Sequence, residues 1–154
     1  MLVQDVMRKE ITLFTPETTF KEAVLTFVDQ KMDSTAVVES RDSKKLIGVI
    51  SLHDLIAKMV PDYLEADPTA ASFETAEFFK RSVLKVADLP IGSFMTKEVH
   101  VAHANHTLIE VATLMAKYNL RSVPIVNEQT GEIVGYSSRR EIKEAMAKVL
   151  QGKV

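Results

Sequence analysis

The chain has 154 residues, 46% of them hydrophobic and 26% charged, which is typical of one globular domain or two small fused ones. A formal net charge of −2 offers no basic surface for nucleic acid, and the lack of cysteine excludes disulfides, thiolate metal sites and cysteine nucleophiles. Because no apolar run reaches membrane-spanning length and the first residues lack a signal-peptide pattern, we expect a cytoplasmic protein with no membrane partner.

Two helices are predicted to begin with the same cap. Thr19 and Glu22 fit the pattern Thr-x-x-Glu, a capping box that satisfies two backbone N–H groups at a helix start, and the pattern recurs at Thr107 and Glu110. After each box, apolar residues follow the spacing i, i+3, i+4, i+7, i+8 of a helix packed on a core. The two stripes are Phe20, Ala23, Val24, Phe27 and Val28, and Leu108, Val111, Ala112, Met115 and Ala116.

Each predicted helix is followed by two apolar, β-branched runs, which indicate two strands joined by a polar turn. A shorter extended segment precedes each helix. The predicted strands are 11–14, 35–39 and 45–51 in the first half, and 99–102, 122–127 and 132–137 in the second. The second polar turn is one residue shorter than the first, a difference that surface turns accommodate easily.

Each half ends in a strand that leads directly into a helix, and these helices are expected at 52–60 and 139–150. Gly48 lies in mid-strand, which predicts the close approach of another backbone segment. Ser51 occupies the N-cap position, and Asp54 falls in the first turn of the helix. A strand end that feeds a helix N-terminus presents N–H groups and hydroxyls to a polar ligand. The equivalent residues of the second half are Gly135, Ser138 and Glu141.

The chain is therefore predicted to be an α+β protein in which one β-α-β-β-α unit is used twice. We expect the first repeat at 1–60, a linker at 61–90 and the second repeat at 91–154. Within the linker, apolar residues at near-helical spacing predict a helix over 72–86, which would brace the two repeats or form part of an oligomer surface.

The duplicated unit resembles a tandem pair of CBS domains, the Bateman module. Both halves end in apolar-Gly-x-x-Ser-x-x-acid, and Ser122–Asn127 is similar to the family's x-x-Pro-Val-Val-Asp strand. The resemblance implies a pseudo-twofold sandwich of two repeats, with a cleft that binds AMP, ADP, ATP or S-adenosylmethionine. It also implies a regulatory module that signals to a partner protein by conformational change, without catalysis or a catalytic cofactor.

In the first half, the resemblance assigns ligand contacts to two short stretches. Ser51 would place its hydroxyl beside the phosphate or ribose, and Asp54 would bind the ribose hydroxyls. Thr35, Ala36 and Val37 align with the strand whose backbone meets the base, although Ala36 replaces the family's usual Pro. Without a ligand, Ser51 and Asp54 would still stabilise the helix as a cap and a first-turn charge.

In the second half, Val123 and Pro124 match the base-contacting strand, and Ser138 matches the hydroxyl position. Glu141 stands where the family prefers Asp, and its extra methylene displaces the carboxylate. Ser138 and Glu141 also fit an ordinary capping box. We therefore expect Asp54 to matter more for ligand binding than Glu141.

Four further residues are candidates for phosphate contacts: Arg121, Arg139, Arg140 and His53. The planar guanidinium group is suited to phosphate, and two of these arginines lie in a first helical turn, where the helix dipole disfavours cations. The alternative is that all four side chains are simply solvated.

Metal binding and catalysis find little support. His100, His103 and His106 suggest zinc, but the first two point to opposite faces of an extended segment, and we expect no metal site. The chain has no nucleophile elbow and no phosphate-binding Gly loop, so we expect no enzyme activity.

The closing helices carry many apolar residues, which suggests that two copies of the chain form a homodimer. These residues are Leu55, Ile56, Met59 and Val60, and Ile142, Ala145, Met146, Val149 and Leu150. The alternative function is a ligand-free homodimerisation or protein-interaction module, in which the caps serve only as caps.

Overall fold

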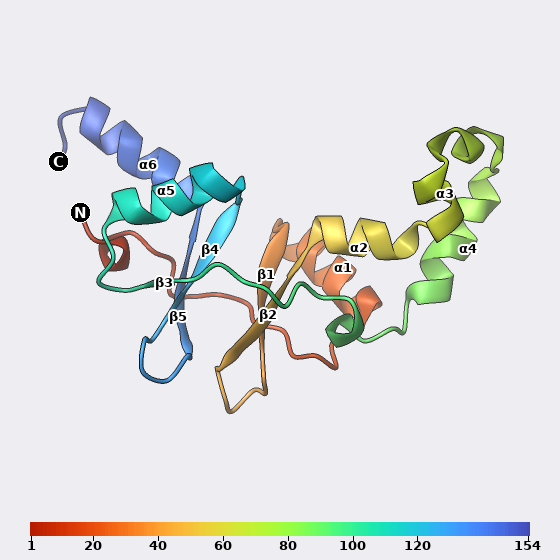
Figure 1. Cartoon of the computed structure of the whole chain (residues 1–154), viewed down its shortest axis with the longest axis horizontal. Coiled ribbons are helices and arrows are strands. Elements are labelled where there is room, and N and C mark those ends of the chain that lie inside the picture. The colour runs from red at the N-terminus through yellow and green to blue at the C-terminus, as the bar shows by residue number, and fades with distance from the viewer. The chain divides into compact units, whose positions relative to one another are not determined.

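The computed structural model describes residues 1–154 and contains two compact units (Figure 1). One unit consists of residues 1–13, 38–47 and 98–154, and the other of residues 14–37 and 48–97. We call them the second-repeat unit and the first-repeat unit, after the repeat that supplies most of each. None of the helices combines the length and apolar composition that a membrane span requires.

The first-repeat unit contains α1 (Phe20–Gln30), most of the two strands β1 (Ser34–Val38) and β2 (Leu46–Ser51), and α2 (Leu52–Met59). The predicted capping box of α1 is confirmed, because the Glu22 N–H donates to Thr19 Oγ1 at 3.1 Å and the Thr19 N–H donates to Glu22 Oε2 at 2.9 Å. Of the predicted stripe, Phe20, Ala23 and Phe27 are buried. Val28 is 73% exposed, so the core covers a narrower face than the periodicity predicts.

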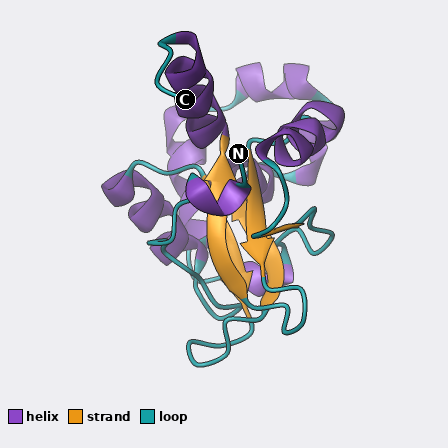
Figure 2. Cartoon of the chain, turned by 90° about the vertical axis from the view of Figure 1, so that its left-hand side faces the viewer, coloured by secondary structure: helices purple, strands orange, loops and turns teal.

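The second-repeat unit contains α5 (Leu108–Tyr118), a three-stranded sheet and α6 (Arg139–Leu150). In the sheet, β4 (Ser122–Val126) lies between β3 (Ala102–His103), which is parallel to it, and β5 (Ile133–Ser138), which is antiparallel. Helix α6 continues directly from the end of β5 (Figure 2). The core of this unit comprises Val3, Ala102, Val111, Met115, Val123 and Ile125.

The capping box of α5 is also confirmed. The Thr107 N–H donates to Glu110 Oε2 at 2.6 Å, and the Glu110 N–H donates to Thr107 Oγ1 at 3.3 Å. Hydrogen bonds from the Thr107 hydroxyl and backbone N–H hold the pKa of Glu110 below its usual value.

The two short strands expected before the helices are only partly formed. The segment 11–14 is reduced to a single parallel bridge between Phe14 and Val37. It cannot continue as a strand, because the Thr15 N–H donates to Thr18 Oγ1 at 3.2 Å and Pro16 has no N–H. In the second half the strand lies one to three residues later than expected, at Ala102–His103.

The linker contains more structure than the single helix predicted over 72–86. Helix α3 (Asp62–Ala66) and a 3-10 helix (Pro68–Phe73) precede α4 (Ala76–Val86), which packs against α2. Helix α4 begins late because Thr75, its N-cap, has an extended backbone, with φ −91° and ψ 165°. Phe73, which the periodicity placed on the helix, is 86% exposed. Figure 1 shows α3 and α4 extending from the end of α2.

Each unit includes a segment from outside its own repeat, and each of these segments contains a short 3-10 helix, Val3–Asp5 or Ile91–Ser93. In the second-repeat unit, the backbone of Arg8 pairs with Tyr136 of β5 through two N–H···O bonds of 2.9 Å. In the first-repeat unit, Thr96 pairs with Val49 of β2 in the same way, again at 2.9 Å. Segment 1–8 therefore bears the same relation to β5 as segment 89–96 bears to β2.

The mid-strand glycines make these pairings possible, as the sequence predicted. A Cβ atom on Gly48 would lie 2.9 Å from the carbonyl oxygen of Thr96 and 2.9 Å from Met95 Sδ. A Cβ atom on Gly135 would meet the side chain of Met7 and lie 3.1 Å from the carbonyl oxygen of Arg8. Any side chain at these two positions would push the incoming segment away from the strand.

Candidate functional site

Ser51 and Asp54 form a closed polar cluster where β2 passes into α2. The Asp54 N–H donates to Ser51 Oγ at 3.2 Å, while the Ser51 N–H and hydroxyl both donate to Asp54 Oδ2, each at 2.9 Å. This is a complete capping box. Both residues are half-buried, so the box fixes the carboxylate at the helix N-terminus without removing it from solvent.

The second oxygen of this carboxylate contacts a residue that sequence reasoning missed. Thr96 Oγ1 donates to Asp54 Oδ1 at 3.2 Å. Thr96 is exposed and belongs to the segment that follows the linker. One sequence signal pointed to this segment, because Met95-Thr96-Lys97-Glu98 repeats the pattern of Met7-Arg8-Lys9-Glu10.

The other predicted residues of the first half lie around this junction or beneath it. His53 is exposed in the first turn of α2, beside Asp54. Thr35, Ala36 and Val37 are buried in β1, with relative exposures of 3% or less. Side chain and backbone are therefore both almost fully covered, and the Ala36 carbonyl accepts from the Phe14 N–H at 3.1 Å.

The corresponding cluster of the second half is more enclosed. The Ser138 N–H donates to Glu141 Oε2 at 2.7 Å, and Arg8 Nε lies 2.9 Å from Glu141 Oε1. Glu141 is 5% exposed and Arg8 is 45% exposed. Arg8 therefore takes the place at Glu141 that Thr96 takes at Asp54, and both carboxylate oxygens of Glu141 are engaged by the protein.

Two of the three arginines predicted to bind phosphate make contacts within the protein. Arg139 donates from Nε to the Leu120 carbonyl and from Nη2 to Asn119 Oδ1, both at 3.0 Å, and so caps the end of α5. Arg140 Nε lies 3.0 Å from Glu144 Oε1, and this hydrogen bond raises the pKa of Arg140. Arg121 is exposed, and its carbonyl accepts from the Arg139 N–H at 3.0 Å.

The remaining candidates of the second half lie in the sheet. Val123 and Pro124 are fully buried in β4, opposite Ser137 and Tyr136 of β5. As in the first half, both the side chains and the backbone of these residues are covered by the protein.

The three histidines considered as metal ligands make other contacts. His103 Nδ1 lies 3.1 Å from the Val126 carbonyl oxygen, and the His103 N–H donates to His106 Nδ1 at 3.3 Å. The ring of His100 stacks on Tyr118 with a centroid separation of 3.9 Å. The chain holds no group of three His, Asp or Glu side chains that could bind a metal ion.

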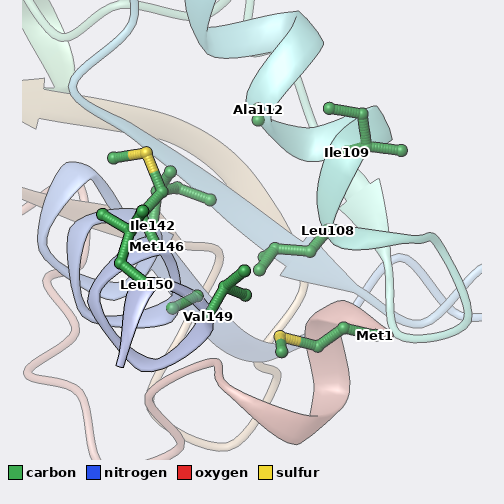
Figure 3. Close-up of a pocket in the computed structure, with 9 residues that line it drawn as sticks. Met1, Leu108, Ile109, Ala112, Ile142, Met146, Val149 and Leu150 are labelled. Atoms are coloured by element: carbon green, nitrogen blue, oxygen red, sulfur yellow. The ribbon is translucent and has the colours of Figure 1, made fainter. Parts of the chain in front are cut away.

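An apolar groove of about 460 Å³ lies between α5 and α6 (Figure 3). Met1 and Leu108 form one end of it, and Leu150 at the end of α6 is 87% exposed. The other residues that line it are Ile109, Ala112, Ile142, Ala145, Met146 and Val149. All five apolar residues that the sequence placed on the second closing helix line this groove.

Two α-β-β-α repeats, preceded by a bridge at Phe14 in the first and by strand β3 in the second, each have a Ser–acid box where the last strand enters a helix. They define a tandem CBS domain pair, and the predicted α+β fold class is confirmed. The sequence profile of the CBS domain matches residues 3–61 and 87–148, so the chain belongs to the CBS domain family.

The chain is 27% identical to an uncharacterised protein of Methanocaldococcus jannaschii, across 95% of this chain and 91% of that protein. The structure is similar to the CBS-pair protein CBSX2 of Arabidopsis thaliana, with a TM-score of 0.78 and 21% identity over 97% of this chain and 96% of CBSX2. A complex of CBSX2 with AMP gives a TM-score of 0.73 at 22% identity, covering 96% and 97%. The CBS domain pair of protein MJ0100, in complex with 5′-methylthioadenosine and S-adenosyl-L-methionine, gives 0.71 at 21% identity, covering 97% and 98%.

Proposed function

We propose that this chain is a regulatory module that binds an adenosine nucleotide or a related adenosyl ligand and signals to a partner protein by a change of conformation. Ser51 and Asp54 of the first repeat hold the ligand. The observation that carries the proposal is the Asp54 carboxylate, which is half-exposed at a helix N-terminus and held in place by Ser51 and Thr96. The AMP complex of CBSX2 and the S-adenosyl-L-methionine complex of the MJ0100 pair support the choice of ligand class.

The geometry of the first repeat suits a ribose. A carboxylate oxygen accepts two hydrogen bonds, so Asp54 Oδ1 retains one acceptor site beside the bond from Thr96. The positive end of the α2 dipole favours a phosphate at the same place. Exposed His53 lies within this first turn and is the candidate for a phosphate contact that is nearest to Asp54 in sequence.

Thermal unfolding in the presence of AMP, ADP, ATP and S-adenosylmethionine tests the proposal. A ligand that binds only the folded chain at a hundredfold excess over its Kd should add about 2.7 kcal/mol of stability. For a chain of this length, that raises Tm by about 5–10 °C. The nucleotide should be recovered intact, because the proposal includes no catalysis. Inorganic phosphate serves as the control, and an unchanged Tm with all four adenosyl ligands would refute the proposal.

We also propose that two copies of the chain form a homodimer, with the apolar groove between α5 and α6 in the interface. An apolar surface of this kind marks an interaction site in a soluble protein. Light scattering at micromolar concentration should give twice the 17.2 kDa chain mass. Val149→Asp should give a monomer, whereas Val134→Asp, at an exposed apolar position of β5 outside the groove, should not. A mass of 17.2 kDa for the unaltered chain would contradict the prediction.

The ligand-free interaction module remains the second candidate, and one observation favours it. Both Ser–acid pairs are complete capping boxes, so each has a structural role without a ligand. A dimer whose Tm is unaffected by every adenosyl ligand would establish this alternative.

A further inference from the structure

A second groove, with a volume of about 740 Å³, lies in the first-repeat unit between the end of α2, the start of α3 and one face of α4. Helices α3 and α4 lie at 62–86, between the two segments that match the CBS domain. The family match therefore covers the α2 side of the groove and Leu89, but not the residues that α3 and α4 contribute. Its volume falls within the range of small-molecule sites.

The groove combines an apolar floor with a cationic rim. Val60, Pro61 and Val86 contribute to the floor, as does Phe78, while Lys58, Arg81 and Lys85 supply three positive charges against the single carboxylate of Asp62. None of the three cations is in a salt bridge, since the salt bridges of the chain are Arg8–Glu141 and Arg140–Glu144. Such a surface attracts a negative charge attached to an apolar body.

Helix electrostatics explain only part of the rim. Lys58 and Lys85 lie in the last turns of α2 and α4, where a cation stabilises the helix dipole without any ligand. Arg81 lies in the middle of α4, so the dipole does not account for it. Its guanidinium carbon lies 5.9 Å from the centroid of the Phe78 ring, which holds the charge over the aromatic wall of the groove.

We propose that this groove binds a small organic anion, in which a carboxylate or phosphate is joined to an apolar body about the size of a phenyl ring. The charges around the groove favour a small ligand over an acidic protein surface. Glu65, Asp67 and Glu77 lie on the same inserted segment but do not line the groove, and they would repel an extended acidic partner. The groove shares no lining residue with the Ser51–Asp54 cluster, which lies at the other end of α2, although Asp54 is only about 6 Å along the helix from Lys58 at 1.5 Å per residue.

Amide NMR shifts of the full chain, titrated with 4-phenylbutyrate, 4-phenylbutyl phosphate and neutral 4-phenylbutyramide, test this inference. At least one of the two anions should saturate shifts at residues 58–63 and 78–89, and the neutral amide should bind at least about tenfold more weakly. The stronger of the two anions identifies the head group. Binding that does not depend on ligand charge, shifts centred on α5 and α6, or no saturation at millimolar concentration would each overturn the proposal.

Two variants sharpen the test. The double variant Arg81→Gln, Lys85→Gln should weaken binding of the anion by about tenfold or more. The control Lys80→Gln removes a cation from the same helix outside the groove and should leave affinity unchanged. Equal losses in both would show that net charge, rather than the groove, attracts the anion.

Discussion

Asp54→Ala should weaken binding of the adenosyl ligand by roughly ten- to a hundredfold, the equivalent of about 1.5–3 kcal/mol for a charged hydrogen-bond acceptor lost from a bound polar group. The carboxylate is half-exposed, and one acceptor site of Oδ1 remains beside the bond from Thr96. Stability should fall by only about 1 kcal/mol, because the helix loses part of a cap and one first-turn charge. Titration calorimetry measures the affinity, and thermal unfolding measures the stability.

Glu141→Ala is the matched control. It should reduce stability more than Asp54→Ala does, and it should reduce affinity much less. Both acids have contacts at each carboxylate oxygen, but Glu141 is only 5% exposed and is covered by its salt bridge with Arg8, whereas Asp54 is partly exposed. Removing Glu141 should cost about 1–3 kcal/mol of stability, while affinity stays nearly unchanged. If Glu141→Ala abolishes binding and Asp54→Ala does not, the ligand is held by the second repeat.

Gly135→Ala should destabilise the chain by about 1–3 kcal/mol, a typical cost of overpacking. For a chain of this length, Tm would fall by roughly 2–4 °C per kcal/mol. The added Cβ would meet Met7 and the Arg8 carbonyl, so segment 1–8 must move away from β5. Hydrogen exchange should show lost protection at Arg8 and Tyr136, whose backbones pair there.

Two comparisons test this explanation for Gly135. Val134→Ala, at the exposed neighbouring position, should change stability by less than about 0.5 kcal/mol. Combining Gly135→Ala with Met7→Ala should recover part of the loss, because the side chain nearest to the new methyl group is shortened. If the Gly135→Ala variant is as stable as the original chain and hydrogen exchange at Arg8 is unchanged, the explanation is wrong, because the added methyl group then fits without moving segment 1–8.

The sequence predicted what depends on neighbouring residues. The Thr19 and Thr107 caps, the two hairpins and the need for glycine at position 48 follow from spacing of a few residues, and all are present. The contacts of Asp54 with Thr96 and of Glu141 with Arg8 join residues far apart in the chain. No local pattern specifies such pairs, so the sequence could not show that the carboxylate of Glu141 forms a salt bridge with Arg8.

The linker and the arginines show two other limits. Helical spacing of apolar residues suggested a helix from position 72, but the extended backbone of Thr75 starts α4 later. Arg139 looked suited to phosphate because a cation is unfavourable in a first helical turn. In the folded chain it bonds to Leu120 and Asn119, at the end of another helix, where a cation is favourable. From the sequence, an arginine can be expected to bond to an oxygen atom. Which oxygen atoms within the protein it contacts is visible only in the folded chain.

The pairing of segment 1–8 with β5 also determines where the chain can be cut. A break in the linker would leave the segment needed by the second repeat attached to the first, so neither fragment would contain a complete unit. A circular permutant that begins at residue 14 would instead bring residues 98–154 and 1–13 into one continuous stretch. The peptide joining the old ends would start beside the groove between α5 and α6, because Met1 and Leu150 both line it (Figure 3). The first segment of the chain to be synthesised therefore packs against the last repeat, and not against the repeat that follows it in sequence.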